Sequence, residues 1–145
     1  MEIEGLKKEH IPQLVRLEAE CFGACAWNEA AFLSEMQNES SVCFCAVDSA
    51  QVLGCIAMSV TPEQGFISKV MTHPAYRRQG IAKALLASFI AYAKEKGFEE
   101  LSLEVRESNT AAIHLYASFD FEIIGKRRQF YRHPKEDAVI MTKRL

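Results

Sequence analysis

The sequence has 145 residues, of which 49% are hydrophobic and 25% are charged, and these values predict one soluble globular domain spanning residues 1–145. The formal net charge of −2 argues against a nucleic-acid binder that works through a broad basic surface. No apolar run approaches the roughly 18 residues of a membrane helix, and the N-terminus lacks the basic-then-apolar form of a signal peptide, so we expect no membrane partner.

The cysteines point to a reducing compartment. There are five, an odd number, and none of their spacings is C-x-x-C. No histidine pair stands near them at metal-ligand spacing. We therefore expect reduced, mostly buried thiols in a cytoplasmic protein without a metal, although a cysteine nucleophile with no identifiable partner stays open.

Hydrophobic periodicity predicts helices and strands that alternate along the chain. Pro12 fits only in the first turn of a helix, Asn28 is a good N-cap, and Gly97 suits a helix C-terminus. In chain order we predict a strand over 1–6, a helix over 8–22, a break over 23–27, a helix from 28 to about 38, strands over 41–48, 52–60 and 66–72, a helix over 81–96, a strand over 101–105, a helix over 110–119, and strands over 121–125 and 138–142.

This order predicts an α/β fold with a mixed, mostly antiparallel sheet flanked by about four helices. The polar link over 49–51 predicts a hairpin between its two neighbouring strands. The strand–helix–strand passage over 66–105 predicts a right-handed parallel crossover. There is no internal repeat, low-complexity segment or linker.

A basic turn between a strand and a helix is the clearest candidate binding site. The strand ends at His73, because the proline after it lacks an amide proton. Arg77 and Arg78 follow, and Gly80 and Ala82 allow a ligand to approach the backbone. The first helical amides have no partner inside the helix, so this turn predicts a phosphate or pyrophosphate site. A solvated basic face explains the charge equally well, while neither a P-loop nor a dinucleotide fingerprint is present.

Three polar side chains follow in the second half of the chain. Glu104 lies on a strand that we expect to be central, where a carboxylate could act as a general base, or it faces solvent on an amphipathic strand. Tyr116 is either a phenol aimed at a leaving group or a core aromatic. Asn109 or Ser108 caps the short helix, and the Asn109 side chain could also hydrogen-bond a ligand.

Two motifs carry a resemblance to a known family. The spacing Arg77-x-x-Gly80-x-Ala82 resembles the acetyl-CoA motif of the GNAT acetyltransferases, Arg/Gln-x-x-Gly-x-Gly/Ala. The run LEVRESNTAAIHLYASFDF over 103–121 is similar to the pattern L-E-V-R-x-S-N-x-x-A-I-x-L-Y-x-x-x-G-F of the RimI branch, the ribosomal-protein-alanine N-acetyltransferases. The resemblance covers nearly the whole chain. It implies the GNAT fold, acetyl-CoA as co-substrate, and an N-terminal alanine as acceptor, that of small-subunit ribosomal protein number eighteen.

The resemblance also implies roles for individual residues. Glu104 corresponds to the general base and Tyr116 to the proton donor. Asp120 departs from the usual glycine but tolerates a left-handed turn, and Phe66 replaces an acidic residue, which leaves Glu104 as the base. The implied cofactor contacts are Val70, Met71 and Thr72 on the strand, Arg77, Arg78, Gln79, Gly80, Ile81 and Ala82 at the pyrophosphate, and Asn109.

The acceptor side is less defined by sequence. Trp27, Glu29 and the segment 127–131 are candidate walls for a peptide N-terminus, and ordinary packing explains each of them equally well. Alternatives are another protein N-terminus or a small amine as acceptor, or a coenzyme A binding module without turnover. A pure binder needs neither Glu104 nor Tyr116, so their presence favours the enzyme. The sequence does not determine the oligomeric state.

Overall fold

The computed structural model describes residues 1–23, 26–132 and 134–145. The elements, in chain order, are β1 (Glu2–Gly5), the 3-10 helix η1 (Lys8–His10), α1 (Ile11–Phe22), α2 (Glu29–Gln37), β2 (Ser41–Asp48), β3 (Gln51–Val60), β4 (Gln64–Thr72), the 3-10 helix η3 (Pro74–Tyr76), α3 (Ile81–Glu95), β5 (Glu100–Arg106), α4 (Thr110–Ser118), β6 (Glu122–Tyr131) and β7 (Glu136–Arg144). None of the helices described is long and apolar enough to cross a membrane.

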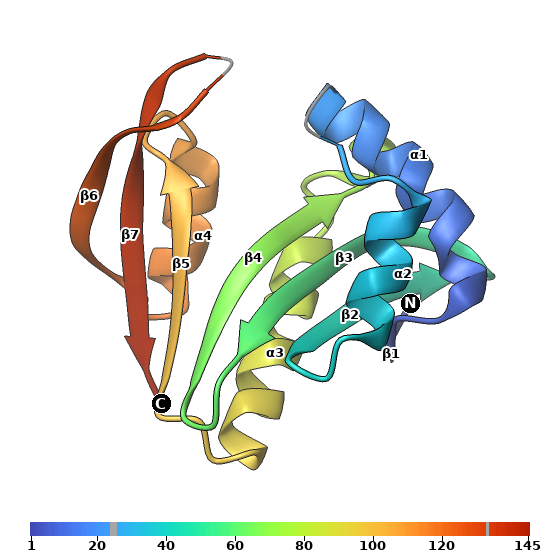
Figure 1. Cartoon of the computed structure of the whole chain (residues 1–145), viewed down its shortest axis with the longest axis horizontal. Coiled ribbons are helices and arrows are strands. Elements are labelled where there is room, and N and C mark those ends of the chain that lie inside the picture. Colours follow the sequence, from blue (N-terminus) through green and yellow to red (C-terminus); the bar gives the residue numbers. More distant parts are fainter. Residues whose placement is uncertain (24–25, 133) are drawn as a thin grey trace.

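The strands form one sheet in the order β1-β2-β3-β4-β5-β7-β6 (Figure 1). Neighbouring strands are antiparallel except β4 and β5, which are parallel and joined through α3. The predicted fold class, a mixed and mostly antiparallel sheet with four helices, is therefore confirmed. The hairpin link is also confirmed, because Ser49 and Ala50 form its turn with φ of 49° and 69°.

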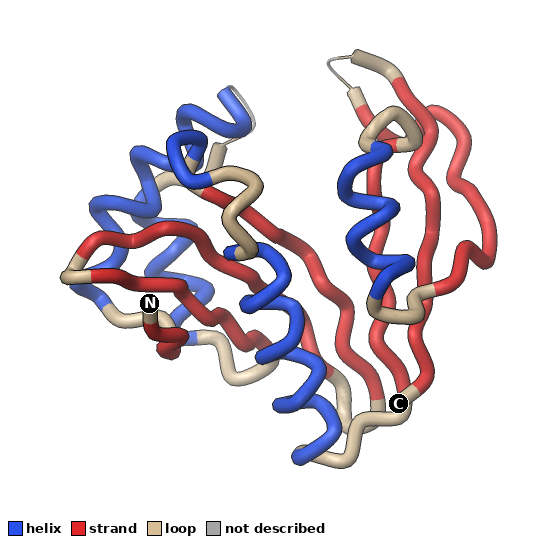
Figure 2. Tube along the Cα trace, turned by 180° about the vertical axis from the view of Figure 1, so that it is seen from behind, coloured by secondary structure: helices blue, strands red, loops and turns tan. Residues whose placement is uncertain are grey.

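Helices cover both faces of the sheet (Figures 1 and 2). On one face α1 and α2 bury a core that contains Leu14 and Phe32, both without exposed surface. On the other face α3 and α4 bury a larger core that contains Phe89 and Tyr116. Two predicted signals position the first pair of helices: proline stands in the first turn of α1, and the Asn28 side chain accepts a hydrogen bond from the Ala31 amide at 2.9 Å.

The parallel pair β4 and β5 separates partway along its length. The ladder between them covers Gln64–Ile67 and Glu100–Leu103. Beyond it β4 stays paired with β3 through a bulge at Ser68, and β5 stays paired with β7. The two strands diverge from there toward the ends that carry Thr72 and Arg106 (Figure 1). Because β4 has lost its neighbour, the backbone groups on that edge of residues 68–72 are available to a ligand.

Gly54 allows this part of β4 to sit close to β3. A Cβ atom at Gly54 would lie 2.4 Å from the Met71 carbonyl oxygen and 3.2 Å from Ile81. Any side chain there would push the strand away from β3 and from the start of α3. Glycine at this position therefore sets the path of residues 68–72. We call these residues the unpaired segment of β4, because they pair with β3 on one edge but with no described strand on the other.

The last two strands are longer than predicted. The strand predicted over 121–125 extends to Tyr131, and the one predicted over 138–142 runs from Glu136 to Arg144. The extension of β6 was missed because it is an edge strand whose basic residues are exposed and show no apolar alternation. Its register shifts between Arg127 and Tyr131, with Gln129 at a φ of 50°. The segment 127–131 thus belongs largely to a strand.

Candidate active site

The basic turn leads directly into α3, as the sequence predicts. Gly80 is the N-cap of α3 with a φ of 82°, and Arg78 has a φ of 64°. The Gly80 carbonyl accepts the first helical hydrogen bond, from the Ala84 amide at 3.0 Å. The amides of residues 81–83 precede that bond, so they point out of the helix N-terminus toward any bound anion.

A pocket of about 350 Å³ opens at this helix end. It lies where β4 ends, α3 begins and α4 passes by, and its lining consists of Thr72, Arg77, Arg78, Gly80, Ile81, Ala82, Lys83, Ala111 and Leu115. The sequence predicted the first six of these residues as cofactor contacts. It missed Lys83 and the two α4 residues; a lysine in the first turn after the glycine was the available signal for Lys83.

Four predicted cofactor contacts lie outside this lining, as far as the described residues show. Val70 and Met71 lie on the unpaired segment of β4, where Val70 packs toward the core under α3 and Met71 toward the core under α1. Gln79 belongs to the turn itself. Asn109 is the N-cap of α4, where its side chain accepts a hydrogen bond from the Ala112 amide at 3.2 Å. Of the two predicted caps, Asn109 is therefore the one observed.

Glu104 lies on β5 beyond the last residue paired with β4. Its side chain is only 10% exposed, so the solvent-facing alternative is wrong. It projects from the face of β5 opposite to Leu103 and Val105, which are buried under α3 and α4. Arg127 of β6 forms an ion pair with this carboxylate, with its Nε 2.9 Å from Oε1 of Glu104. The carboxylate is therefore enclosed by protein and neutralised by one guanidinium.

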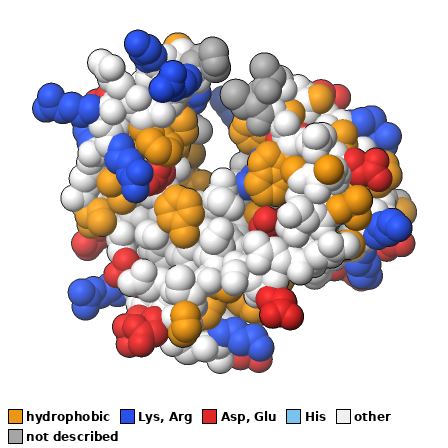
Figure 3. All heavy atoms as spheres, viewed as in Figure 1, with side chains coloured by type: hydrophobic (Ala, Val, Ile, Leu, Met, Phe, Trp, Pro, Cys, Tyr) orange, Lys and Arg blue, Asp and Glu red, His pale blue; other side chains and the backbone are white. Residues whose placement is uncertain are grey.

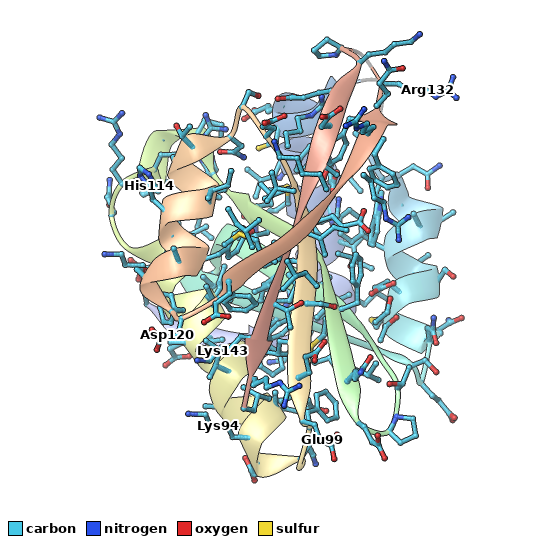
Figure 4. All side chains as sticks on the ribbon, turned by 90° about the vertical axis from the view of Figure 1, so that its left-hand side faces the viewer. Lys94, Glu99, His114, Asp120, Arg132 and Lys143 are labelled. Carbon is cyan, nitrogen blue, oxygen red and sulfur yellow. The ribbon has the colours of Figure 1, made fainter. Side chains whose placement is uncertain are left out.

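The end of the β6–β7 hairpin is fixed against β5 by Arg106. Its guanidinium donates to the backbone oxygens of Arg132 and Pro134 at 3.1 and 3.0 Å and pairs with Glu136 at 3.2 Å. Glu136 also accepts from the Ser108 amide at 2.6 Å, and hydrogen bonding to Ser108 lowers the pKa of this carboxyl. Figure 4 shows Arg132 at the far end of this hairpin, away from Glu99. These contacts position the strand that carries Arg127.

Tyr116 of α4 lies beside the pocket residue Leu115 and is 7% exposed. Its ring packs against Phe121 with the centroids 5.8 Å apart. Burial, with a smaller effect of the Tyr131 phenol, raises the pKa of Tyr116 to about 12. The phenol therefore keeps its proton near neutral pH. Asp120 follows α4 with a φ of 68°, which confirms the left-handed turn predicted there. Its Oδ2 lies 4.0 Å from the Lys143 ammonium group, and Figure 4 labels both residues near the end of α4.

Across the gap where β4 and β5 diverge, opposite to Glu104, lies a buried ion pair that sequence analysis missed. Lys69 of β4 pairs with Glu18 of α1, and their side chains are 8% and 0% exposed. The Lys69 ammonium lies 4.2 Å from the Trp27 ring centroid and 4.7 Å from that of Phe22. The Trp27 amide donates to Glu18 at 3.2 Å. The signal in the sequence was a glutamate on the apolar side of the first helix, and Lys69 is its partner.

In the space-filling view the surface is hollowed between these two sides (Figure 3). One side is formed by β5, β7 and β6 and the other by β4 with α1 and α2. The predicted anion pocket borders the opening from the face of α3 and α4, and Glu104 borders it from the opposite face of the sheet. The arrangement can hold a long, negatively charged molecule at one face and present its end to a carboxylate at the other.

Comparisons with known proteins point to one family. The family model described as Acetyltransferase (GNAT) matches residues 11–121. The chain is 32% identical over 142 residues to the [Ribosomal protein bS18]-alanine N-acetyltransferase of Escherichia coli K12, covering 97% of this chain and 95% of that protein. It is 31% identical over 113 residues to the Haemophilus influenzae protein of the same name, covering 76% and 77%. The crystal structure of the Escherichia coli ribosomal-protein-S18-alanine N-acetyltransferase superimposes with a TM-score of 0.90 at 31% identity, covering 99% and 92%.

Proposed function

The chain belongs to the GNAT family and is an N-acetyltransferase that uses acetyl-CoA, and we propose that its acceptor is the α-amine of an N-terminal alanine, that of ribosomal protein bS18. The observation that carries this proposal is the full-length similarity to relatives named for that reaction, together with a buried carboxylate at the opening between β4 and β5. A cytoplasmic location stays a prediction from the cysteine content.

The pocket fits the charged part of coenzyme A. Arg77, Arg78 and Lys83 bring three cations to the N-terminal amides of α3. Pyrophosphate at a helix N-terminus is stabilised by those amides and by the helix dipole. The unpaired edge of β4 offers backbone groups to the amides of the pantetheine arm, as Val70, Met71 and Thr72 are proposed to do. When bound, acetyl-CoA supplies an acetyl group activated as a thioester.

The acceptor must lose a proton before it can attack, because an ammonium group has no lone pair. We assign to Glu104 the role of accepting this proton, either directly or through a water molecule, since its carboxylate is enclosed at the opening. An α-amine has an ordinary pKa near 8, so at neutral pH a substantial fraction is already neutral. The base therefore has less to do here than it would for a lysine side chain.

Charge develops at two other atoms during the transfer. A backbone amide of residues 70–72 would stabilise the thioester oxygen, an effect of about 3 kcal/mol for one donor. Tyr116 would donate to the departing sulfur, because burial keeps its phenol protonated. Thiols have an ordinary pKa near 8.5, so complete transfer from a phenol of pKa about 12 is uphill and the hydrogen bond itself carries most of the stabilisation.

Intact-mass spectrometry tests the proposed acceptor. The protein is mixed with acetyl-CoA and a short peptide that carries the N-terminal sequence of bS18, beside the same peptide blocked at its α-amine. We expect a gain of one acetyl group on the free peptide and none on the blocked one. A gain on both peptides would place the acetyl group on a side chain, and no gain on either, with acetyl-CoA bound, would reject this acceptor in favour of another amine.

A further inference from the structure

The Arg127–Glu104 ion pair blocks the carboxylate that the reaction needs. We propose that Arg127 is a displaceable counter-ion: it occupies Glu104 in the free enzyme, and the α-ammonium group of the acceptor takes its place on binding. This inference rests on the role proposed for Glu104. It makes Arg127 a positioning residue that sets how easily an acceptor cation enters.

The two partners differ sharply in how firmly they are held. The Glu104 side chain is 10% exposed and lies on a strand paired with β7 along its length, whereas the Arg127 side chain is 59% exposed and lies on the edge strand β6. Arg127 therefore has room to move and Glu104 does not. The ring of Phe130 lies 5.4 Å from the Arg127 guanidinium carbon, so this aromatic face can hold the cation after it leaves.

The charge balance favours an exchange of one cation for another. A carboxylate that is nine-tenths enclosed is costly to leave without a counter-charge. When an acceptor ammonium replaces the guanidinium, Glu104 stays paired and the guanidinium remains exposed to solvent beside the Phe130 ring. The N–H proton of that ammonium then lies against the carboxylate that accepts it, and the neutral amine that remains carries the lone pair for attack.

Other ionisable groups near Glu104 do not offer the same exchange. The Tyr131 phenol is close enough that the Glu104 charge contributes, after burial, to raising its pKa, and it carries no positive charge. Arg106 is engaged by Arg132, Pro134 and Glu136. Of the charged groups described around this carboxylate, Arg127 is the one both paired with it and largely exposed.

Steady-state kinetics with the alanine peptide at saturating acetyl-CoA tests the exchange. Because Arg127→Met removes the competing cation, we expect the acceptor KM to fall about twofold to fivefold, the range for a partly exposed ion pair, with a smaller change in kcat. Arg127→Lys should restore a KM near that of the wild type. Lys126→Met is the control, since Lys126 is the neighbouring residue on β6 and pairs with Glu107 instead, at 2.6 Å. An unchanged or raised KM in Arg127→Met would overturn the proposal.

A second measurement separates this proposal from the choice of acceptor. Carboxyl labelling with a carbodiimide and an amine, read by peptide mass spectrometry, reports access to Glu104 without any acceptor peptide. We expect Glu104 to be labelled faster in Arg127→Met than in wild type and Lys126→Met. If the peptide is not acetylated but Glu104 is labelled faster in Arg127→Met, the proposed acceptor is wrong and the role of Arg127 as counter-ion stands. Equal labelling of Glu104 in all three proteins overturns that role.

Discussion

The two faces of the sheet that border the opening are built by different means. On the face of α3 and α4, the anion pocket draws seven of its nine lining residues from residues 72–83, which follow one another closely in the chain, and it includes the N-terminus of α3. On the opposite face, two ion pairs act through side chains from four separate elements, namely Glu104 with Arg127 and Lys69 with Glu18. The first face depends on local backbone conformation and the second on tertiary packing.

This difference predicts that mutations will separate cofactor binding from chemistry. We expect a change at the turn to alter the path of a few amides and, with it, the affinity for coenzyme A. A change at the side-chain cluster alters proton transfer or stability while the pocket is retained.

The largest expected effect is on chemistry. Replacing Glu104 by Gln removes the proposed base but keeps the shape of the side chain, so we expect turnover to fall by about 10² to 10⁴, the usual range for general base catalysis. Acetyl-CoA affinity, measured by calorimetry on the same protein, should stay near the wild-type value because the pocket lies on the other face of the sheet. Full turnover in this variant would remove Glu104 from the mechanism.

The next effect is on stability. Replacing Lys69 by Met leaves the fully buried Glu18 carboxylate without its cation, so we expect the free energy of unfolding in urea to fall by about 3–5 kcal/mol. The double variant with Glu18→Gln should recover part of that loss. Lys126→Met, which breaks an exposed pair, should have a much smaller effect; equal losses in the two lysine variants would mean that the buried pair does not stabilise this side.

Tyr116 should make stability depend on pH in the alkaline range. A free tyrosine loses its proton near pH 10, whereas burial raises the pKa of Tyr116 to about 12. Between these values the unfolded chain binds fewer protons than the folded one, so the free energy of unfolding should fall as pH rises, by up to about 2–3 kcal/mol. The measurement is the difference in the free energy of unfolding between wild type and Tyr116→Phe as a function of pH. A difference that does not change with pH would show that the phenol ionises freely in the folded protein.

The smallest effect is expected at the turn. Gly80 has a φ of 82° and open space where a Cβ atom would be, so Gly80→Ala strains the backbone without a clash. A left-handed residue with a side chain costs about 1–2 kcal/mol, and we expect a loss of this size in acetyl-CoA affinity, in stability or shared between them. Gly5→Ala, a glycine in β1 with equally open space but no positive φ, is the control. An unchanged affinity and stability in Gly80→Ala would show that the turn tolerates a side chain.

Sequence alone predicted the turn well because its determinants are local. The proline at 74, the glycine at 80 and the apolar spacing of the next helix all act within a few residues, and the structure places six of the predicted contacts around one pocket. Order along the chain also predicted the fold class, since strand–helix–strand passages have few alternatives.

Sequence could not predict the ion pairs, because each joins residues far apart in the chain. Lys69 and Glu18 are 51 positions apart, and nothing local indicates that β4 runs beside α1. The sequence predicted Arg127 only as part of a candidate wall of the acceptor site. Its strand is polar and exposed, and its contact with Glu104 depends on how β6 pairs with β7. A charged residue on an apolar helix face, such as Glu18, is the pattern that signals such a partner.

We expect residues 68–72 of β4 and the start of α3 to bind acetyl-CoA together. Amide hydrogen exchange, followed residue by residue by NMR with and without saturating acetyl-CoA, tests it most directly. Residues 68–72 and 81–83 should exchange more slowly when acetyl-CoA is bound, while residues 64–67, already paired with β5, should not change. Unchanged exchange at 68–72 in the saturated protein would show that acetyl-CoA does not bind along this edge of β4.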